Sequence, residues 1–212
     1  MIKLSIGGGE IFELKSEDSS KLSRKTLDEI VNFTINTFQS GMTEGEVLNH
    51  IKGNDLFLLL YKGENAIGFA GSKYISPGNY AERIAYLSAA VVSSEFQGLG
   101  LYRELVKERV DVALDLGLHI ITTKTQNPLV EFTIREDLSR RVTEGQITGY
   151  SIDRKMLPGT FGRKLTENFK ESKDKTINIA YRSLNLDRGD GYYLTFYLEL
   201  NKEKVKGFGG GV

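Results

Sequence analysis

The chain has 212 residues, 40% hydrophobic and 26% charged, with apolar runs far shorter than the ~20 residues of a membrane-spanning helix. Its 28 basic and 28 acidic residues give zero formal net charge, so no global field attracts nucleic acid or an anionic membrane. Cysteine is absent and no G-x-S-x-G elbow occurs, which excludes disulfides, thiolate nucleophiles and cysteine-ligated metal and disfavours a histidine-dependent hydrolase.

The first elements in chain order are a short strand and two helices. Residues 1–9 lack the longer apolar core of a secretory signal, so we expect a flexible end and a cytoplasmic protein. Residues 10–15 alternate as a strand does, and the next ~25 residues show the spacing of a helix that Ser23 caps. Thr43 and Glu46 form a capping box, which predicts a second helix.

Three strands and a long helix follow. The pattern predicts strands at 56–61, 66–75 and 83–92, joined by short turns as an antiparallel meander. Residues 101–116 have the broad apolar face of a helix that lies against a sheet, and Gly117 ends this helix.

The C-terminal part is predicted to be a strand, a helix and a hairpin. The strand covers 118–123, and Asn127, followed by proline, caps a helix that reaches about residue 138. A final hairpin is expected from 176–186 and 192–200. The segment at about 140–175 shows no clear pattern, and we expect it to be an insertion.

The segment that indicates a function is an apolar strand that runs through a glycine turn into a helix: Gln97-Gly98-Leu99-Gly100-Leu101-Tyr102. The first amides of a helix have no intrahelical acceptor, and the helix dipole favours an anion there. Gly98 and Gly100 let the backbone approach a diphosphate, and Arg103 adds a charged donor. A plain connecting turn is the simplest alternative. A dinucleotide site fits badly, because Arg103 stands where the third glycine of G-x-G-x-x-G belongs.

This turn resembles the acyl-CoA signature of the GNAT superfamily, Q/R-x-x-G-x-G/A, with a departure at Tyr102. The order of predicted elements is also similar over about 10–200, apart from 140–175. The resemblance implies an α/β fold in one GNAT-like domain over 1–212, with a mixed, mostly antiparallel sheet, splayed central strands, helices on both faces and flexible glycine-rich termini. It implies an N-acetyltransferase that transfers an acetyl group from acetyl-CoA to a primary amine in a ternary complex, without a metal. The alternative is a non-catalytic acyl-CoA-binding regulatory module.

The resemblance also assigns the cofactor contacts. The pyrophosphate is expected on the backbone of the signature turn, with Arg103 beside it, and the pantetheine along the preceding strand. Asn127 matches a family asparagine that faces the cofactor, and as an alternative it is simply the helix cap. The cofactor-binding residues implied are Ala90, Val91, Val92, Gln97, Gly98, Leu99, Gly100, Leu101, Tyr102, Arg103 and Asn127.

Catalytic roles are assigned to Glu82, Tyr86 and Tyr102. Tyr86 stands eleven residues before Gln97, where some family members carry a catalytic glutamate, so the role of base passes to Glu82 through water, with Tyr86 alternatively a packing residue. The family's tyrosine acid corresponds to Ile134 here. Tyr102 can supply a phenol near the sulfur instead, or no acid is needed, since a thiol has a pKa near 8.5.

The acceptor stays open between a small molecule and a protein amine, and a homodimer is one possible assembly. His50, on the second predicted helix, stands either at the acceptor wall or toward solvent. We expect the segment 140–175 to cap the acceptor side.

Overall fold

The computed structural model describes residues 1–6, 9–38, 41–76, 84–165 and 170–201, which form one eight-stranded sheet in the order β1-β2-β3-β4-β5-β6-β8-β7. The strands are β1 (Ile2–Ile6), β2 (Glu10–Ser16), β3 (Leu56–Lys62), β4 (Asn65–Ile75), β5 (Ile84–Val92), β6 (Ile120–Thr125), β7 (Ile147–Leu157) and β8 (Gly191–Leu200). The helices are α1 (Arg24–Phe38), α2 (Glu44–Ile51), the short η1 (Ser94–Phe96), α3 (Leu101–Asp115), α4 (Pro128–Thr143) and α5 (Lys175–Tyr181).

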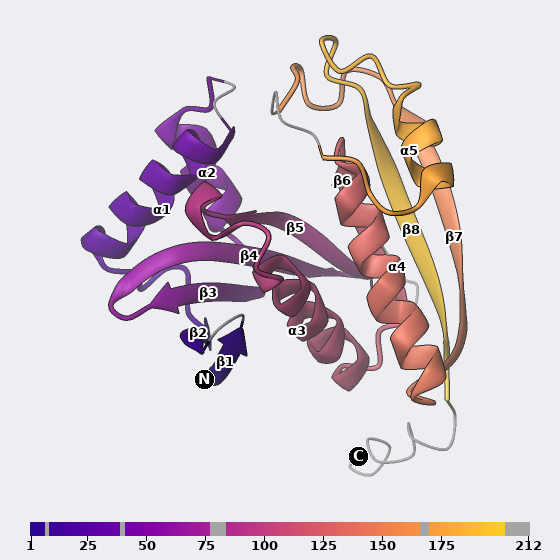
Figure 1. The fold of residues 1–212 in the computed structure, drawn as a ribbon, viewed down its shortest axis with the longest axis horizontal. Coiled ribbons are helices and arrows are strands. Elements are labelled where there is room, and N and C mark those ends of the chain that lie inside the picture. Colours follow the sequence, from indigo (N-terminus) through magenta and orange to yellow (C-terminus); the bar gives the residue numbers. More distant parts are fainter. Residues whose placement is uncertain (7–8, 39–40, 77–83, 166–169, 202–212) are drawn as a thin grey trace.

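The sheet is mixed and mostly antiparallel, as the family resemblance implied. Among the described strands only β5 and β6 pair in parallel, and this pair divides the sheet into two halves. Figure 1 shows α1 and α2 beside the half made of β1 to β5, and α4 and α5 beside the half made of β6, β8 and β7. The meander of β3, β4 and β5 is confirmed.

The two faces of the first half are covered by different helices. Ile30 of α1 and Val47 of α2 pack with Phe69 on one face of the sheet. On the other face, Leu101 and Leu105 of α3 pack with a separate cluster that includes Leu58, Leu60 and Ala70. An opening between β5 and β6 therefore connects the face of the sheet covered by α3 with the face covered by α1 and α2.

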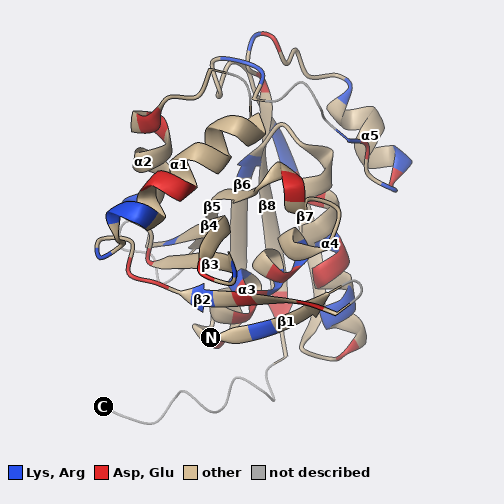
Figure 2. Ribbon diagram, turned by 60° about the vertical axis from the view of Figure 1, so that its left-hand side comes forward, with Lys and Arg blue, Asp and Glu red and all other residues tan. Residues whose placement is uncertain are grey.

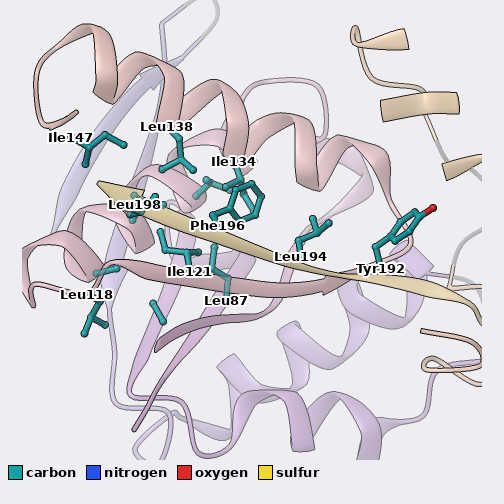
Figure 3. Packing of buried hydrophobic residues seen from close by; sticks show 14 of the residues in the cluster. Leu87, Leu118, Ile121, Ile134, Leu138, Ile147, Tyr192, Leu194, Phe196 and Leu198 are labelled. Carbon is teal, nitrogen blue, oxygen red and sulfur yellow. The ribbon is translucent and has the colours of Figure 1, made fainter. Parts of the chain in front are cut away.

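The largest core cluster lies between α3, α4 and the second half of the sheet. Ile134 and Leu138 extend from α4 toward the strand that carries Phe196 and Leu198 (Figure 3), and all four side chains are buried. The guanidinium of Arg141, also buried, pairs with Asp137 of its own helix at 2.6 Å and joins α4 to α3 by an ion pair of 2.6 Å to Asp111. These contacts fix the two helices that stand beside the parting strands.

The helix caps read from the sequence are present. Ser23 Oγ accepts a hydrogen bond from the Thr26 N–H at 3.1 Å before α1. Thr43 and Glu46 form the reciprocal capping box of α2. Asn127 Oδ1 accepts from the Leu129 N–H at 2.9 Å and opens α4, which runs to Thr143, five residues past the predicted end.

The prediction of a strand at 176–186 is wrong, because this stretch begins with the helix α5. Ile177, Ile179 and Tyr181 alternate as in a strand, which misled the pattern. Asp174, however, accepts hydrogen bonds from the N–H groups of Thr176 and Ile177 and so starts a helix. Within it Ile177 and Tyr181 are buried, four residues apart, while Ile179 is 65% exposed.

The description of 140–175 as an insertion is wrong for its first part, which contains β7 and thus the true partner of β8. This strand lies at the edge of the sheet, and its charged run Asp153-Arg154-Lys155 blunts that edge and hides the alternation. The predicted flexibility at the N-terminus is also wrong over β1, which pairs with β2. The glycine-rich C-terminal tail lies outside the described residues.

No helix in the described part of the chain is both long and apolar enough to cross a membrane. The cytoplasmic location expected from the sequence stays a prediction.

Candidate functional site

The site is a cleft that opens where β5 and β6 part. The two strands pair over only four positions, from Ile84↔Ile120 to Leu87↔Thr123. Beyond Leu87, β6 continues beside β8 as far as Thr125↔Tyr192, and β5 continues beside β4 as far as Gly68↔Val92. A cleft of about 480 Å³ lies between the diverging strands and is lined from both faces of the sheet.

A β-bulge in β5 lies at the start of this divergence. Ser88 and Ala89 both stand opposite Gly71, because the register passes from Ser72↔Leu87 to Ala70↔Ala90. The Ser88 hydroxyl donates to Asn54 Oδ1 at 2.7 Å directly over Gly71, where a Cβ would lie 2.4 Å from that oxygen. Only glycine fits there, so the bulge is built into the packing of the sheet.

The bulge sets which backbone groups of β5 face the cleft. The Ser93 N–H donates to Ile67 O at 2.8 Å, on the β4 side. Backbone groups alternate between the two edges of a strand, so those of Val91 also face β4, whereas those of Ala90 and Val92 face the open edge. Val92 O there accepts from Gln97 Nε2 at 3.1 Å, which closes the loop between strand and turn.

The glycine turn exposes a row of backbone donors. Gly98 and Gly100 have φ values of +86° and +84°, and a Cβ on either would meet nothing within 4 Å, so they serve the backbone conformation and leave the surface open. The Gln97 N–H is taken by Ser94 O and the Arg103 N–H by Gly100 O. Among the described residues, none of the five N–H groups of 98–102 donates a hydrogen bond.

Five adjacent donors at the start of the 15-residue helix α3 suit an anion, because their dipoles and the helix dipole point the same way. The two other proposed cofactor residues flank it. Arg103 is exposed and paired with Glu136 of α4 at 2.9 Å. Asn127 lines the cleft and uses Oδ1 for the α4 cap, and its Nδ2 donates to no described residue.

Tyr102 reaches the cleft from the α3 side and contacts Arg109, a residue that the sequence analysis missed. Arg109 is only 1% exposed, and it donates to Leu105 O at 3.2 Å and to Gly71 O at 3.4 Å, opposite the bulge. The Arg109 guanidinium also acts electrostatically on the Tyr102 phenol. The sequence signal is an arginine between Val106 and Val110 on the apolar face of α3.

This pair determines what the phenol can do. An arginine has donors only, so the Tyr102 O–H cannot donate to Arg109 and is left for the cleft that Tyr102 lines. Burial raises the pKa of Tyr102, and the nearby Arg109 charge opposes part of that shift. The phenol is therefore protonated near neutral pH. Ile134, at the position of the family's tyrosine, is fully buried and lines the cleft without a polar group.

Tyr86 lies on the other side of the sheet, with Lys73 opposite on β4 and Thr122 opposite on β6. Burial raises its pKa, and the neighbouring Tyr193 adds to the shift. His50 also lines the cleft, and burial lowers the pKa of its imidazole, with Glu46 opposing and Lys73 reinforcing that shift. Glu82, the proposed base, lies outside the described residues.

The remaining wall is a strap, residues 158–165, between β7 and α5. Three of its side chains, Thr160, Phe161 and Leu165, line the cleft. Gln126, just after β6, binds the strap through both polar atoms of its side-chain amide. Its Nε2 donates to Arg163 O at 3.0 Å, and its Oε1 accepts from the Leu165 N–H at 2.9 Å.

The strap also reaches α2 across the cleft. Arg163 Nη2 lies 2.8 Å from Glu46 Oε1, so it bridges residues 117 positions apart in sequence. At its root the Phe161 ring packs on Gly191, where a Cβ would lie 2.3 Å from the ring. This part of the segment 140–175 does border the cleft, as expected of a cap.

A model of the acetyltransferase (GNAT) family matches residues 24–135, more than half of the chain. Solved structures with the same fold include a putative phosphinothricin N-acetyltransferase (12% identity, TM-score 0.54, 90% of this chain and 99% of that one). Others are the Bacillus subtilis acetyltransferase in complex with CoA (13%, 0.53, 89% and 99%) and the NatC complex bound to Gag peptide and CoA (14%, 0.52, 90% and 99%). Likenesses at this identity show the fold alone. The comparison with curated proteins finds no match.

Proposed function

The chain belongs to the acetyltransferase (GNAT) family, and from this premise we propose that it transfers an acetyl group from acetyl-CoA to a primary amine by direct attack in a ternary complex. The observation that carries the proposal is the row of five backbone N–H groups at 98–102 without acceptors. They follow β5, the strand whose open edge lines the cleft, after the short helix η1.

In this proposal the residues of the chain hold acetyl-CoA along one continuous path. The amides of 98–102 bind the pyrophosphate, with Arg103 free to exchange its exposed partner Glu136 for a phosphate. The open-edge backbone groups of Ala90 pair with the pantetheine, and Val92 contributes its N–H because its carbonyl is taken by Gln97. Asn127 offers its Nδ2 from the opposite wall.

When bound, acetyl-CoA supplies a thioester whose carbonyl carbon is attacked by the neutral amine as the C–S bond breaks. The Tyr102 O–H, free of Arg109, donates to the departing sulfur. Tyr86 is proposed as a donor, because a phenol with a raised pKa keeps its proton near pH 7. The base role of Glu82 stays a prediction. A base matters most for lysine-like acceptors. Deprotonating the ammonium group at pH 7 costs about 4.6 kcal/mol when its pKa is near 10.4, but about 1 kcal/mol when its pKa is near 7.7.

A second candidate function, acyl-CoA binding without catalysis, is favoured by the apolar Ile134 on α4. Two measurements separate the candidates. Acetyl-CoA should raise the melting temperature, because a ligand bound at a hundredfold excess over Kd adds about 2.7 kcal/mol of stability. Release of free CoA thiol in the presence of amines then supports transfer. A melting shift without thiol release over a broad amine panel favours the binding module, and no shift removes both candidates.

A further inference from the structure

We propose that the acceptor is a small primary amine that also carries an anionic group, a carboxylate or a phosphonate, bound by Lys73 and Lys124 on the α1–α2 side of the cleft. This inference rests on the proposed acetyl transfer and names the class of its acceptor. It starts from the charges of the described residues that line the cleft: Lys73, Lys124, Arg109 and His50, with no aspartate or glutamate among them.

The two lysines stand on opposite walls and on the same face of the sheet. Lys73 pairs with Tyr86 across β4 and β5, and Tyr86 pairs with Thr122 across β5 and β6. Lys124 follows Thr122 by two residues, so its side chain leaves the same face. Phe69, four residues before Lys73, packs in the cluster of α1 and α2, which identifies this face. An anion between the walls can thus contact both ammonium groups.

Neither lysine has a counter-ion in the described part of the chain, where no salt bridge or hydrogen bond involves either ammonium group. Lys73 is half-buried, and lysines removed from water are normally paired, because desolvating an unpaired charge is costly. Glu46, whose charge acts on the neighbouring His50, is already bound by the Thr43 N–H at 2.7 Å and by Arg163 at 2.8 Å. A ligand anion would supply the missing charge.

The positive lining is local. The whole chain has zero formal charge, and Figure 2 shows basic and acidic residues interspersed over the helices. The cofactor's phosphates do not account for it, because the amides of 98–102 open α3, which packs on the opposite face of the sheet. The lysines therefore stand on the side left for the acceptor.

The space favours a small acceptor. The cleft of about 480 Å³ must hold the acyl end of acetyl-CoA as well as the amine. The strap narrows the acceptor side further, because Gln126 and the Arg163–Glu46 pair tie it across to α2. A small amine with an anionic group fits this volume and this charge.

The test compares matched acceptors by thiol release from acetyl-CoA: amino acids, their amides and the corresponding aminophosphonates. We expect kcat/KM for the anionic members to exceed that for the amides at least about tenfold, or about 1.4 kcal/mol. The amino group of the amide is less basic than that of the acid, so a larger fraction of it is neutral at pH 7. Without a charge preference of the site, the amide would therefore react faster. Turnover of amides as good as that of the acids, or no turnover of any anionic amine, overturns the inference.

Variants assign the effect to the lysines. Lys73→Met should lower the ratio of kcat/KM for the acid to kcat/KM for the amide about tenfold, while Lys73→Arg should keep this ratio. Lys52→Met, an exposed lysine just after α2 that does not line the cleft, is the matched control. An acid preference that survives Lys73→Met and Lys124→Met together contradicts the assignment.

A melting shift with acetyl-CoA is recorded for each protein, so that the two levels of proposal can be told apart. If the shift is present and the amides are preferred, the acceptor class is wrong while the cofactor proposal stands. If wild type shows neither shift nor turnover, the proposed function itself fails and takes the acceptor class with it.

Discussion

The two ends of the cleft differ in the groups that line them, backbone amides at one end and side chains at the other. The proposed cofactor end is backbone, five N–H groups within the continuous stretch 98–102. The proposed acceptor end is side chains from β4, β6, α2 and the strap, such as Lys73, Lys124 and His50. A backbone site keeps its chemistry when side chains change, whereas a side-chain site changes its preference with each substitution. The first end therefore defines a reaction shared with a family, and the second defines what is particular to this chain.

The largest effect is expected from a change that breaks the backbone end alone. Gly100→Asp places a carboxylate where a phosphate must approach the amides, so acetyl-CoA affinity should fall at least about a hundredfold, or about 2.7 kcal/mol. The fold should persist, because Asp is one of the few residues that adopt a positive φ, at a cost of roughly 1–2 kcal/mol. Isothermal titration with acetyl-CoA measures the loss.

Gly117→Asp is the matched control for this variant. Gly117 ends the same helix with φ +69° and equally open surroundings, so the substitution brings the same strain and charge to the far end of α3. Its acetyl-CoA affinity should equal that of wild type. Equal losses in both variants would mean that the effect is general destabilisation.

Tyr102→Phe tests the one side chain placed between the two ends. Removal of the phenol should lower kcat about tenfold and leave acetyl-CoA affinity unchanged, a small effect for acid catalysis because a thiolate leaves easily. Tyr150→Phe is the control, since the Tyr150 phenol hydrogen-bonds to Ser139 and does not line the cleft. An unchanged kcat together with a lower melting temperature would make Tyr102 a packing residue.

Arg163→Ala should weaken the acceptor end only. The Arg163–Glu46 pair is partly exposed, at 35% and 40%, so its loss should raise the KM of the acceptor roughly two- to fivefold without changing the Kd of acetyl-CoA. Arg182→Ala, which removes the more exposed surface pair with Glu171, should change neither constant. An equal change in both constants would place the strap in the cofactor site.

The smallest effect concerns Glu46, whose pKa is held at about 2, first by the Thr43 backbone N–H and then by Arg163. An unfolded glutamate has a pKa of about 4.3, so the stabilisation is complete above that pH and is lost as the pH falls toward 2. The melting temperature of wild type should exceed that of Glu46→Gln by a constant amount above pH ~5 and converge with it below pH ~4. A difference that grows in acid would reverse the sign and contradict the assignment.

The parts that the sequence predicted correctly are local. The meander of β3, β4 and β5 joins neighbours through short turns and is visible in a contiguous pattern. The glycine turn also lies within six residues, and its role in anion binding stays a proposal. The pairing of β7 with β8 is not local, because α5 and the strap stand between the two strands. The charged edge strand and the misleading alternation of Ile177 and Ile179 then removed the remaining signal.

The acceptor end could not be read from the sequence for the same reason. Lys73 and Lys124 share a face only because the registers of β4, β5 and β6 align Tyr86 with both neighbours. Arg109 reaches the bulge only because α3 packs beside Gly71. These contacts depend on strand register and helix packing, which a contiguous sequence pattern does not contain.

The central claim, that the amides of 98–102 bind the cofactor's pyrophosphate, is tested most directly by NMR of the 15N-labelled protein during titration with acetyl-CoA. Hydrogen bonds to phosphate oxygens move amide protons downfield, so the account predicts the largest downfield shifts at Gly98, Leu99, Gly100, Leu101 and Tyr102. The Gly117 amide, at the other end of α3, should stay unchanged. Saturable binding with unmoved amides at 98–102 would contradict the claim.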